Sequence, residues 1–473
     1  MVEKLSKSQD QRNKALFIGT IIYAIGNFGT KFLSFLIVPL YTYYISPADM
    51  GDYDILCTTV NLLTPLITMQ ISDAAFRWMI SDRKNVLSCV SATYKLIFVN
   101  GLITIGIILA VNFFIPITYC YYFIAILILG RILGSMQKLL RGLKNQKLFA
   151  LSGVVYTAVF LILNLLLVCV FKMGVVALLW STIIANIVAI AFVLILEKDL
   201  RKFDIKTKHF NLQKQLLRYS IPLVPSTLNW WVMSASNRYF IRYFMSNAAN
   251  GIFAVANKFP SILSTVFLMF NNSWTDMALA ESGNKDDSSE YYSKIFEKLY
   301  VFSFTSLFIL VPATKLVTQW ILSTDYKEAS IYIAFLYLGT VFQAFSSFYS
   351  VGYLKRKATV GAAATSIYGA LVNVIVNLFF IKYIGLHAAS ISTFLGFFVM
   401  WIIRMIQTRE SLPIRINKVL FSALFLIGLG ICLISIWSSV MLDLILCFVG
   451  LLLFVLINRE MIVFIIGKLL KRK

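Results

Sequence analysis

The sequence predicts an all-α integral membrane protein of about fourteen transmembrane helices, in two six-helix lobes followed by two extra helices. Three observations lead to this fold class. Of the 473 residues, 59% are apolar and 14% charged, and the mean hydropathy is +0.81, well above that of soluble domains. Apolar runs of roughly twenty residues recur along the chain, which suits spanning helices and is about twice the length of a barrel strand. Several short motifs also occur twice.

The apolar runs divide the chain into consecutive predicted spans. They cover residues 16–45, 52–77, 86–112, 117–140, 149–171, 174–196, 217–244, 250–278, 297–321, 331–354, 359–382, 385–406, 418–438 and 441–466. The first run begins near Ala15 and continues to about Tyr44, too long for the apolar core of a cleaved signal peptide.

Basic residues are distributed unequally between the two sides of these spans. One side holds the N-terminal lysines and arginines, Arg83 and Lys84, the segments 138–147, 198–214, 355–357 and 409–418, and the terminal KLLKRK. The opposite side holds Lys172, Arg242, Lys315, Lys327 and Lys382. The positive-inside rule therefore predicts that both termini are cytoplasmic. It also explains most of the formal charge of +22, so no nucleic-acid partner is expected.

The first half of the chain resembles the second. PLYTYYISPADMGDYDIL at 39–56 aligns with YFMSNAANGIFAVAN at 243–257, and MGVVALLWST at 173–182 aligns with IGLHAASIST at 384–393. Tyr156 and Asn164 correspond to Tyr368 and Asn377. We predict an N-terminal lobe at 1–197, a cytoplasmic linker at 198–216, a C-terminal lobe at 217–408, and two extra helices with a basic tail at 409–473. Because each lobe has an even number of spans, the expected pseudo-twofold axis runs along the membrane normal.

Polar residues form stripes along four spans, at spacings that place them on one helix face. The stripes are Tyr23, Asn27, Thr30, Lys31 and Ser34; Asp54, Thr58, Asn61, Pro65, Thr68 and Ser72; Thr227, Trp230, Trp231, Ser234 and Arg238; and Lys258, Ser261, Thr265 and Asn272. We expect these four helices to line a central cavity.

Lys31 is the strongest candidate for a functional cation, since it lies about fourteen residues from either end of its span. A lysine at that depth costs roughly 3 kcal/mol on insertion scales. We expect it to be a cavity cation that meets the substrate; the alternative is a structural ion pair with Asp54 or Asp73.

Other charged and aromatic residues leave two interpretations open. Arg238 and Lys258 either contact substrate or extend to the membrane interface, and Arg131, on a polar face with Ser135 and Lys138, has the same functional and structural alternatives. Asp73 and Arg77 are four residues apart, which favours an intrahelical ion pair. Trp230 and Trp231 lie in mid-span, where they either stack on a sugar or pack against neighbouring helices.

Several function classes lack the residues they need. The chain has no P-loop, no metal-spaced His or Cys cluster, and only His209 and His387 as histidines. The six cysteines lack CxxC spacing and suit packing positions. We find no large extramembrane loop with paired carboxylates for acid–base chemistry. Transport without ATP, without a cofactor or metal and without enzymatic activity is the remaining class.

The segment FLIVPLYTYYISPADMGDYDIL at 35–56, the span count, the repeat and the two extra helices resemble the Wzx-type polysaccharide flippases. These proteins share a superfamily with the MATE drug exporters and the lipid II flippase. The resemblance implies alternating access around a cationic cavity in a bacterial cytoplasmic (inner) membrane. The implied substrate is a polyprenyl-pyrophosphate-linked oligosaccharide, moved to the outer leaflet for a cell-surface polysaccharide such as a capsule or an O-antigen.

The resemblance also implies roles for particular parts of the chain. Lys31, assisted by Arg238 and Lys258, would meet the pyrophosphate. Related proteins often carry arginine at the position of Lys31, so a point-charge contact is expected instead of a bidentate one. Spans 13 and 14 would guide the lipid tail. Implied partners are membrane lipids, a polysaccharide polymerase and other assembly proteins.

Two other functions are compatible with the chain. A MATE-like antiporter of drugs or small molecules would need a buried carboxylate for ion coupling, for which Asp54 and Asp73 are the candidates in the first half. The basic character of the predicted cavity disfavours it. An intramembrane scaffold for sugar assembly is the third possibility, but it would leave the full-depth polar stripes without a purpose.

Overall fold

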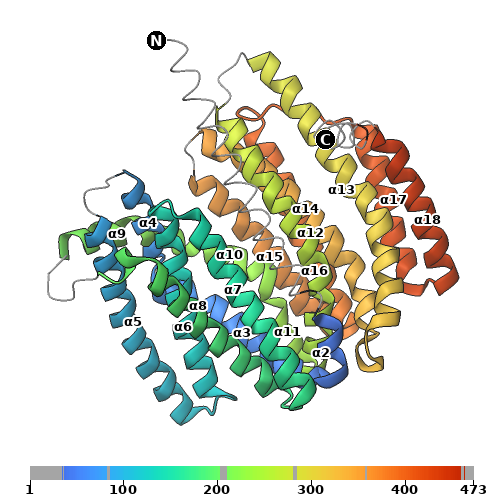
Figure 1. The fold of residues 1–473 in the computed structure, drawn as a ribbon. Coiled ribbons are helices and arrows are strands. Elements are labelled where there is room, and N and C mark those ends of the chain that lie inside the picture. Colours follow the sequence, from blue (N-terminus) through green and yellow to red (C-terminus); the bar gives the residue numbers. More distant parts are fainter. Residues whose placement is uncertain are drawn as a thin grey trace, which may run out of the picture. The chain divides into compact units, whose positions relative to one another are not determined.

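The chain is built from α-helices in the computed structural model (Figure 1). The structure describes residues 37–81, 86–202, 210–280, 285–356 and 359–459, with the single positions 35 and 463. No β-strand occurs in these ranges. The helices form two compact units, unit 1 (Met1–Ile45 and Asp52–Trp231) and unit 2 (Ser46–Gly51 and Val232–Lys473).

The membrane class is confirmed. In the described ranges, eleven helices are long and apolar enough to cross a membrane, or twelve if one bent pair counts as a single span. The count of fourteen is not confirmed. Most of the expected first span, 16–45, lies outside the described residues, and the expected span 217–244 is divided among short helices.

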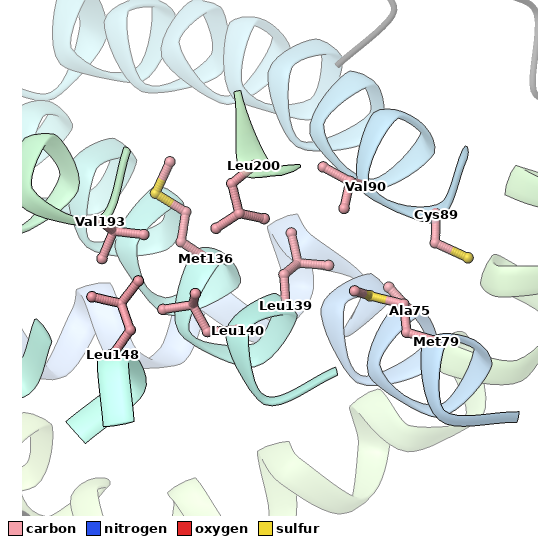
Figure 2. Close-up of a cluster of buried hydrophobic side chains, with 10 residues drawn as sticks. All are labelled: Ala75, Met79, Cys89, Val90, Met136, Leu139, Leu140, Leu148, Val193 and Leu200. Atoms are coloured by element: carbon pink, nitrogen blue, oxygen red, sulfur yellow. The ribbon is translucent and has the colours of Figure 1, made fainter. Parts of the chain in front are cut away.

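Unit 1 contains most of helices α2 to α10. Their bounds are α2 Val38–Tyr44, α3 Pro47–Thr68, α4 Ile71–Ser81, α5 Val86–Phe114, α6 Cys120–Gly142, α7 Gln146–Asn164, α8 Val175–Leu196, α9 Phe210–Ser220 and α10 Val224–Ala235. A π-helical turn, Leu165–Val170, extends α7. Figure 2 shows part of the core, where Met79 of α4, Val90 of α5, Leu139 of α6 and Val193 of α8 pack together.

The expected continuous span 52–77 is wrong. Helices α3 and α4 meet at a bend of 57°, and Met69 and Gln70 between them have left-handed backbones with φ of 46° and 53°. Such a conformation costs roughly 1–2 kcal/mol for each non-glycine residue. Pro65, one turn earlier, already removes a backbone donor from α3. At the break, Asn100 Nδ2 of α5 donates to the Ile67 carbonyl at 2.9 Å and so satisfies an acceptor near the interrupted end.

The expected span 217–244 is also interrupted. Helix α9 ends at Ser220, a 3-10 turn follows at Ile221–Leu223, and α10 and α11 are separated at Ser236. Pro222 and Pro225 restrict the backbone at the first interruption, because each lacks the amide that a continuous helix requires.

Unit 2 contains helices α11 to α18. Their bounds are α11 Asn237–Phe244, α12 Asn247–Ala280, α13 Lys285–Ile321, α14 Ala329–Lys355, α15 Thr359–Ile384, α16 Leu386–Thr408, α17 Lys418–Trp437 and α18 Val440–Ile457. Its core is rich in aromatic rings centred on Phe342 of α14, which contacts Phe304 of α13 and Trp401 of α16. Phe421 of α17 stacks on Trp401 with ring centroids 5.3 Å apart.

The two extra helices are firmly attached within unit 2, where α17 and α18 lie beside α13 (Figure 1). Lys315 Nζ of α13 donates to the carbonyls of Ser435 at 2.6 Å and Ser438 at 2.9 Å, and lies 3.6 Å from the buried carboxylate of Asp443. Near the other end of the hairpin, Asn458 Nδ2 donates to Thr305 Oγ1 at 3.0 Å. Lys315, which the sequence analysis counted among the basic residues on the non-cytoplasmic side, is therefore buried and joins α13 to the two extra helices.

Two glycine pairs show that the repeated motifs build repeated structure. Gly174 caps α8 with φ 57° and ψ −138°, and Gly385 caps α16 with φ 56° and ψ −136°. Positive φ at these values favours glycine, so the same residue forms the same turn in each unit.

The second glycine pair lies wholly in unit 2. A Cβ on Gly51 would sit 1.9 Å from the Asn247 carbonyl oxygen, and a Cβ on Gly251 would sit 1.9 Å from the Pro47 carbonyl oxygen. Asn250 Nδ2 also donates to the Gly51 carbonyl at 3.0 Å. The first turns of α3 and α12 thus cross in backbone contact, which explains glycine at both positions of the motif.

Gly450→Ala is expected to destabilise the protein. Its Cβ would lie 2.3 Å from the Phe308 carbonyl oxygen of α13, and overpacking of this kind costs about 1–3 kcal/mol. Gly430→Ala on α17 is the control, because nothing lies within 4 Å of its Cβ and a helical Gly→Ala change gains about 0.5–1 kcal/mol. Thermal unfolding in detergent should show a lower melting temperature for the first variant alone. Equal behaviour of the two would contradict the packing of α18 on α13.

Candidate functional site

The predicted cavity residues fall into three groups. Asn27, Thr30, Lys31 and Ser34 lie outside the described residues. Unit 1 contains Asp54, Asn61, Asp73, Arg131, Trp230 and Trp231, and unit 2 contains Ser234, Arg238 and Lys258.

In unit 1, hydrogen bonds join α10 to α3 and to the break after it. Trp231 Nε1 donates to the Thr58 carbonyl at 3.1 Å, and Gln70 Nε2 donates to Thr227 Oγ1 at 3.0 Å. A partly buried tryptophan usually satisfies its N–H in this way. Asn61, one turn beyond Thr58, is exposed on α3. The Trp231 side chain is thus anchored on α3, and Asn61 is exposed.

The expected Asp73–Arg77 ion pair does not form. Asp73 Oδ2 instead lies 2.5 Å from Lys138 Nζ on α6, and the Arg77 guanidinium lies over the Tyr219 ring, 4.6 Å from its centroid. The bend at Gln70 reorients α4, so a partner on another helix replaces the one four residues away. One candidate carboxylate for ion coupling is thus already paired with a cation.

Arg131 is enclosed between α5 and α6. Its side chain is 3% exposed, and Nη2 donates to the Ile97 carbonyl at 2.7 Å. Nε and Nη1 have no hydrogen-bond partner among the described residues. A Cβ on Gly101 would lie 2.5 Å from Nη2, so glycine at that position makes room for the guanidinium. On the same face of α6, Ser135 Oγ accepts a hydrogen bond from Ser72 Oγ at 2.9 Å. The predicted polar face of α6 thus points toward α4 and α5.

Two of the predicted cations lie on neighbouring helices of unit 2. Arg238 is on α11 and Lys258 is on α12, and these helices pack against each other. Both side chains are half-buried. Arg238 Nη1 donates to the Ser234 carbonyl at 2.9 Å, so the guanidinium is bonded to a residue four positions earlier in the chain.

Unit 2 also contains a buried amide–hydroxyl network that the sequence analysis missed. Asn237 Nδ2 donates to the Ala389 carbonyl at 2.8 Å and to Thr393 Oγ1 at 2.7 Å. Asn377 Nδ2 donates to Asn237 Oδ1 at 2.9 Å and to Ser392 Oγ at 2.8 Å. The network joins α11, α15 and α16. The internal repeat could have indicated this network, since Asn377, Ser392 and Thr393 are among the residues matched between the halves.

The matched residues of unit 1 are arranged differently. Asn164 Nδ2 donates to the Phe160 carbonyl of its own helix at 2.6 Å, and Thr182 lies 3.3 Å from the Tyr53 hydroxyl. In the described part of the chain, no group of three or more His, Cys, Asp or Glu side chains is placed to hold a metal ion.

Comparison with known proteins gives one family and one fold. A family model described as "Polysaccharide biosynthesis protein" matches residues 16–275, more than half of the chain. No curated protein sequence matches. The fold is similar to "Lipid II flippase MurJ, inward closed conformation", with TM-score 0.66, 14% identity, 93% coverage of this chain and 100% of that chain.

Two MATE structures are also similar. An inward-facing multidrug resistance MATE family transporter has TM-score 0.63 and 16% identity, and covers 83% of this chain and 95% of that one. A MATE in the straight conformation has TM-score 0.59 and 18% identity, and covers 87% of this chain and 96% of that one. At these identities the likeness shows the fold.

Asn377→Leu should destabilise the protein more than the matched change Asn164→Leu. The first change removes two hydrogen bonds between helices, to Asn237 Oδ1 and Ser392 Oγ, at about 0.5–1.5 kcal/mol each. The second removes a bond to a helical carbonyl and an oxygen that has no partner among the described residues. Thermal unfolding of both variants measures the difference. Equal losses would show that the network contributes nothing beyond packing.

Proposed function

Because the chain belongs to the polysaccharide biosynthesis protein family, we propose that it is a flippase for a polyprenyl-pyrophosphate-linked oligosaccharide. The substrate moves from the cytoplasmic to the outer leaflet of a bacterial inner membrane, by alternating access, for export of a cell-surface polysaccharide. The family match carries this proposal. The fold likeness to a structure titled as a lipid II flippase supports it.

The charge of the substrate explains the need for intramembrane cations. A pyrophosphate bears about two negative charges, and an uncompensated charge in hydrocarbon is costly. We assign Lys31, Arg238 and Lys258 to this headgroup. Half-burial of Arg238 and Lys258 on two adjacent helices supports the assignment, because such cations keep part of their charge accessible. Arg131, enclosed between α5 and α6, acts mainly through the packing of unit 1 in this proposal.

The sugar and the polyprenyl tail of the substrate need different surroundings. Exposed Asn61 and Ser234 would hydrogen-bond the sugar, with Trp230 available for stacking. The polyprenyl tail would stay in the bilayer, guided by α17 and α18. Exposed apolar side chains along these helices, such as Leu444, Phe448 and Leu451, are compatible with contact to lipid.

A MATE-like antiporter of small molecules is the second candidate, since MATE transporters share the fold. It needs a carboxylate that exchanges protons or sodium. Asp73 is paired with Lys138 at 2.5 Å, which makes it a poor carrier of a second cation. Asp54 would then be the coupling residue in unit 1.

The proposal predicts stabilisation by a short polyprenyl pyrophosphate. A ligand that binds only the folded state contributes about 2.7 kcal/mol at a hundredfold excess over its Kd, so the melting temperature of the detergent-purified protein should rise. Lys31→Gln and Lys258→Gln should each reduce that rise. Lys382→Gln is the matched control, because its Nζ lies over the Phe244 ring, 5.1 Å from the centroid, and it is not a predicted cavity residue.

The same titration with a cationic dye separates the two candidates. Stabilisation by the dye alone, or an unchanged response of Lys31→Gln and Lys258→Gln to pyrophosphate, would reject the flippase proposal. An Asp54→Asn variant that loses the dye response would then favour the antiporter.

A further inference from the structure

Unit 2 contains a pocket whose lining includes none of the predicted cavity residues that the structure describes. It has a volume of about 460 Å³ and is bounded by the first turns of α13, the last turns of α14 and α16, and the connection from α16 to α17. Its polar lining consists of Ser289, Tyr349, Arg409, Glu410 and Arg415. This volume is within the range of small-ligand sites, roughly 300–1,000 Å³.

The connection that forms one wall is fixed by hydrogen bonds. Ser289 Oγ of α13 donates to the Pro413 carbonyl at 2.6 Å, and the Arg415 amide donates to Ser293 Oγ at 2.8 Å. The Leu412 amide donates to the Thr408 carbonyl at 2.8 Å, and the Leu412 side chain is buried. The wall is thus preformed, so little ordering of the chain is needed when a ligand binds.

The pocket lining is electropositive, because Glu410, the one carboxylate among its described lining residues, is already paired. Glu410 accepts from Arg356 Nη2 at 3.1 Å, and Glu290 lies 2.6 Å from Lys294 Nζ. Neither partner cation lines the pocket. The exposed guanidinium groups of Arg409 and Arg415 therefore contribute net positive charge at its mouth. Guanidinium groups suit phosphate oxygens because their donors match them in pairs.

Tyr349 supplies an independent sign of a ligand. Its side chain lines the pocket and is 1% exposed, yet its hydroxyl has no hydrogen-bond partner among the described residues. Buried hydroxyls are usually paired, because an unpaired one loses its hydration without compensation. A phosphate oxygen in the pocket would accept this hydrogen bond.

We propose that this pocket binds a phosphate group, held by Arg409, Arg415 and the Tyr349 hydroxyl, and that an anionic phospholipid headgroup supplies it. Four apolar spanning segments, Ser289–Ile321, Ala329–Lys355, Leu386–Thr408 and Lys418–Trp437, begin or end at the pocket. Lipid headgroups occupy this level of a membrane, just outside the hydrocarbon. Free phosphate offers the same chemistry from solution. The site is independent of the proposed flippase function.

The test uses the full-length protein in detergent and isothermal titration calorimetry. The probes are dihexanoyl phosphatidylglycerol, dihexanoyl phosphatidylcholine and inorganic phosphate. Phosphatidylglycerol should bind at least tenfold more tightly than phosphatidylcholine. Arg409→Gln with Arg415→Gln should weaken binding at least tenfold. Tyr349→Phe should weaken it several-fold while leaving the melting temperature of the unliganded protein unchanged or higher, because the hydroxyl has no protein partner to lose.

The control is the double variant Lys298→Gln with Lys418→Gln, which removes the same charge from exposed positions that do not line the pocket. It should bind phosphatidylglycerol as the wild type does. Competition by inorganic phosphate supports the phosphate assignment, and binding of phosphate without phosphatidylglycerol overturns the lipid source. Wild-type affinity in the arginine double variant, or an equal loss in the lysine control, overturns the site.

Discussion

The main constraint on this protein is that hydrocarbon offers no partner for a backbone amide or carbonyl. Helices meet the constraint along most of the described chain, and the departures from helix are the informative places. At the break between α3 and α4, the amide of Asn100 satisfies the Ile67 carbonyl, and Gln70 bonds to Thr227 of α10. At the turn between α17 and α18, Lys315 donates to the carbonyls of Ser435 and Ser438. Polar side chains inside the units thus replace the water that irregular backbone would otherwise need.

The same constraint explains which charges serve structure. Lys315 and Asp443 are both buried, and such a pair is favourable only when further hydrogen bonds surround it. Ser438 provides them, because its hydroxyl bonds both Asp443 and Lys315. Arg404 is enclosed in the same manner, with donors to the Ser346 carbonyl and to the hydroxyls of Thr365 and Ser366. A cation within a span is therefore not by itself a sign of substrate contact.

Sequence patterns predicted the all-α membrane class, because hydropathy is a local property of the chain. They missed the bend at Met69 and Gln70, since neither residue is a usual helix breaker and the break depends on contacts from α5, α6 and α10. They also paired Asp73 with Arg77 from spacing alone, whereas Lys138, 65 residues away, is the partner. Contacts between residues far apart in the sequence produce no periodic pattern from which they could be predicted. Lys31 stays a prediction.

The asymmetry between the repeats gives a physical reason for two halves that share motifs and differ in chemistry. Asn377 joins a network of three helices, whereas its counterpart Asn164 bonds within its own helix. Unit 2 further acquires the α17–α18 hairpin, tied at both ends. Unit 1 carries the bent α3–α4 pair, whose left-handed residues store strain that is offset by side-chain bonds. At Gln70 one side chain bonds both Thr227 and Lys138, so α10 and α6 hold the bend in place.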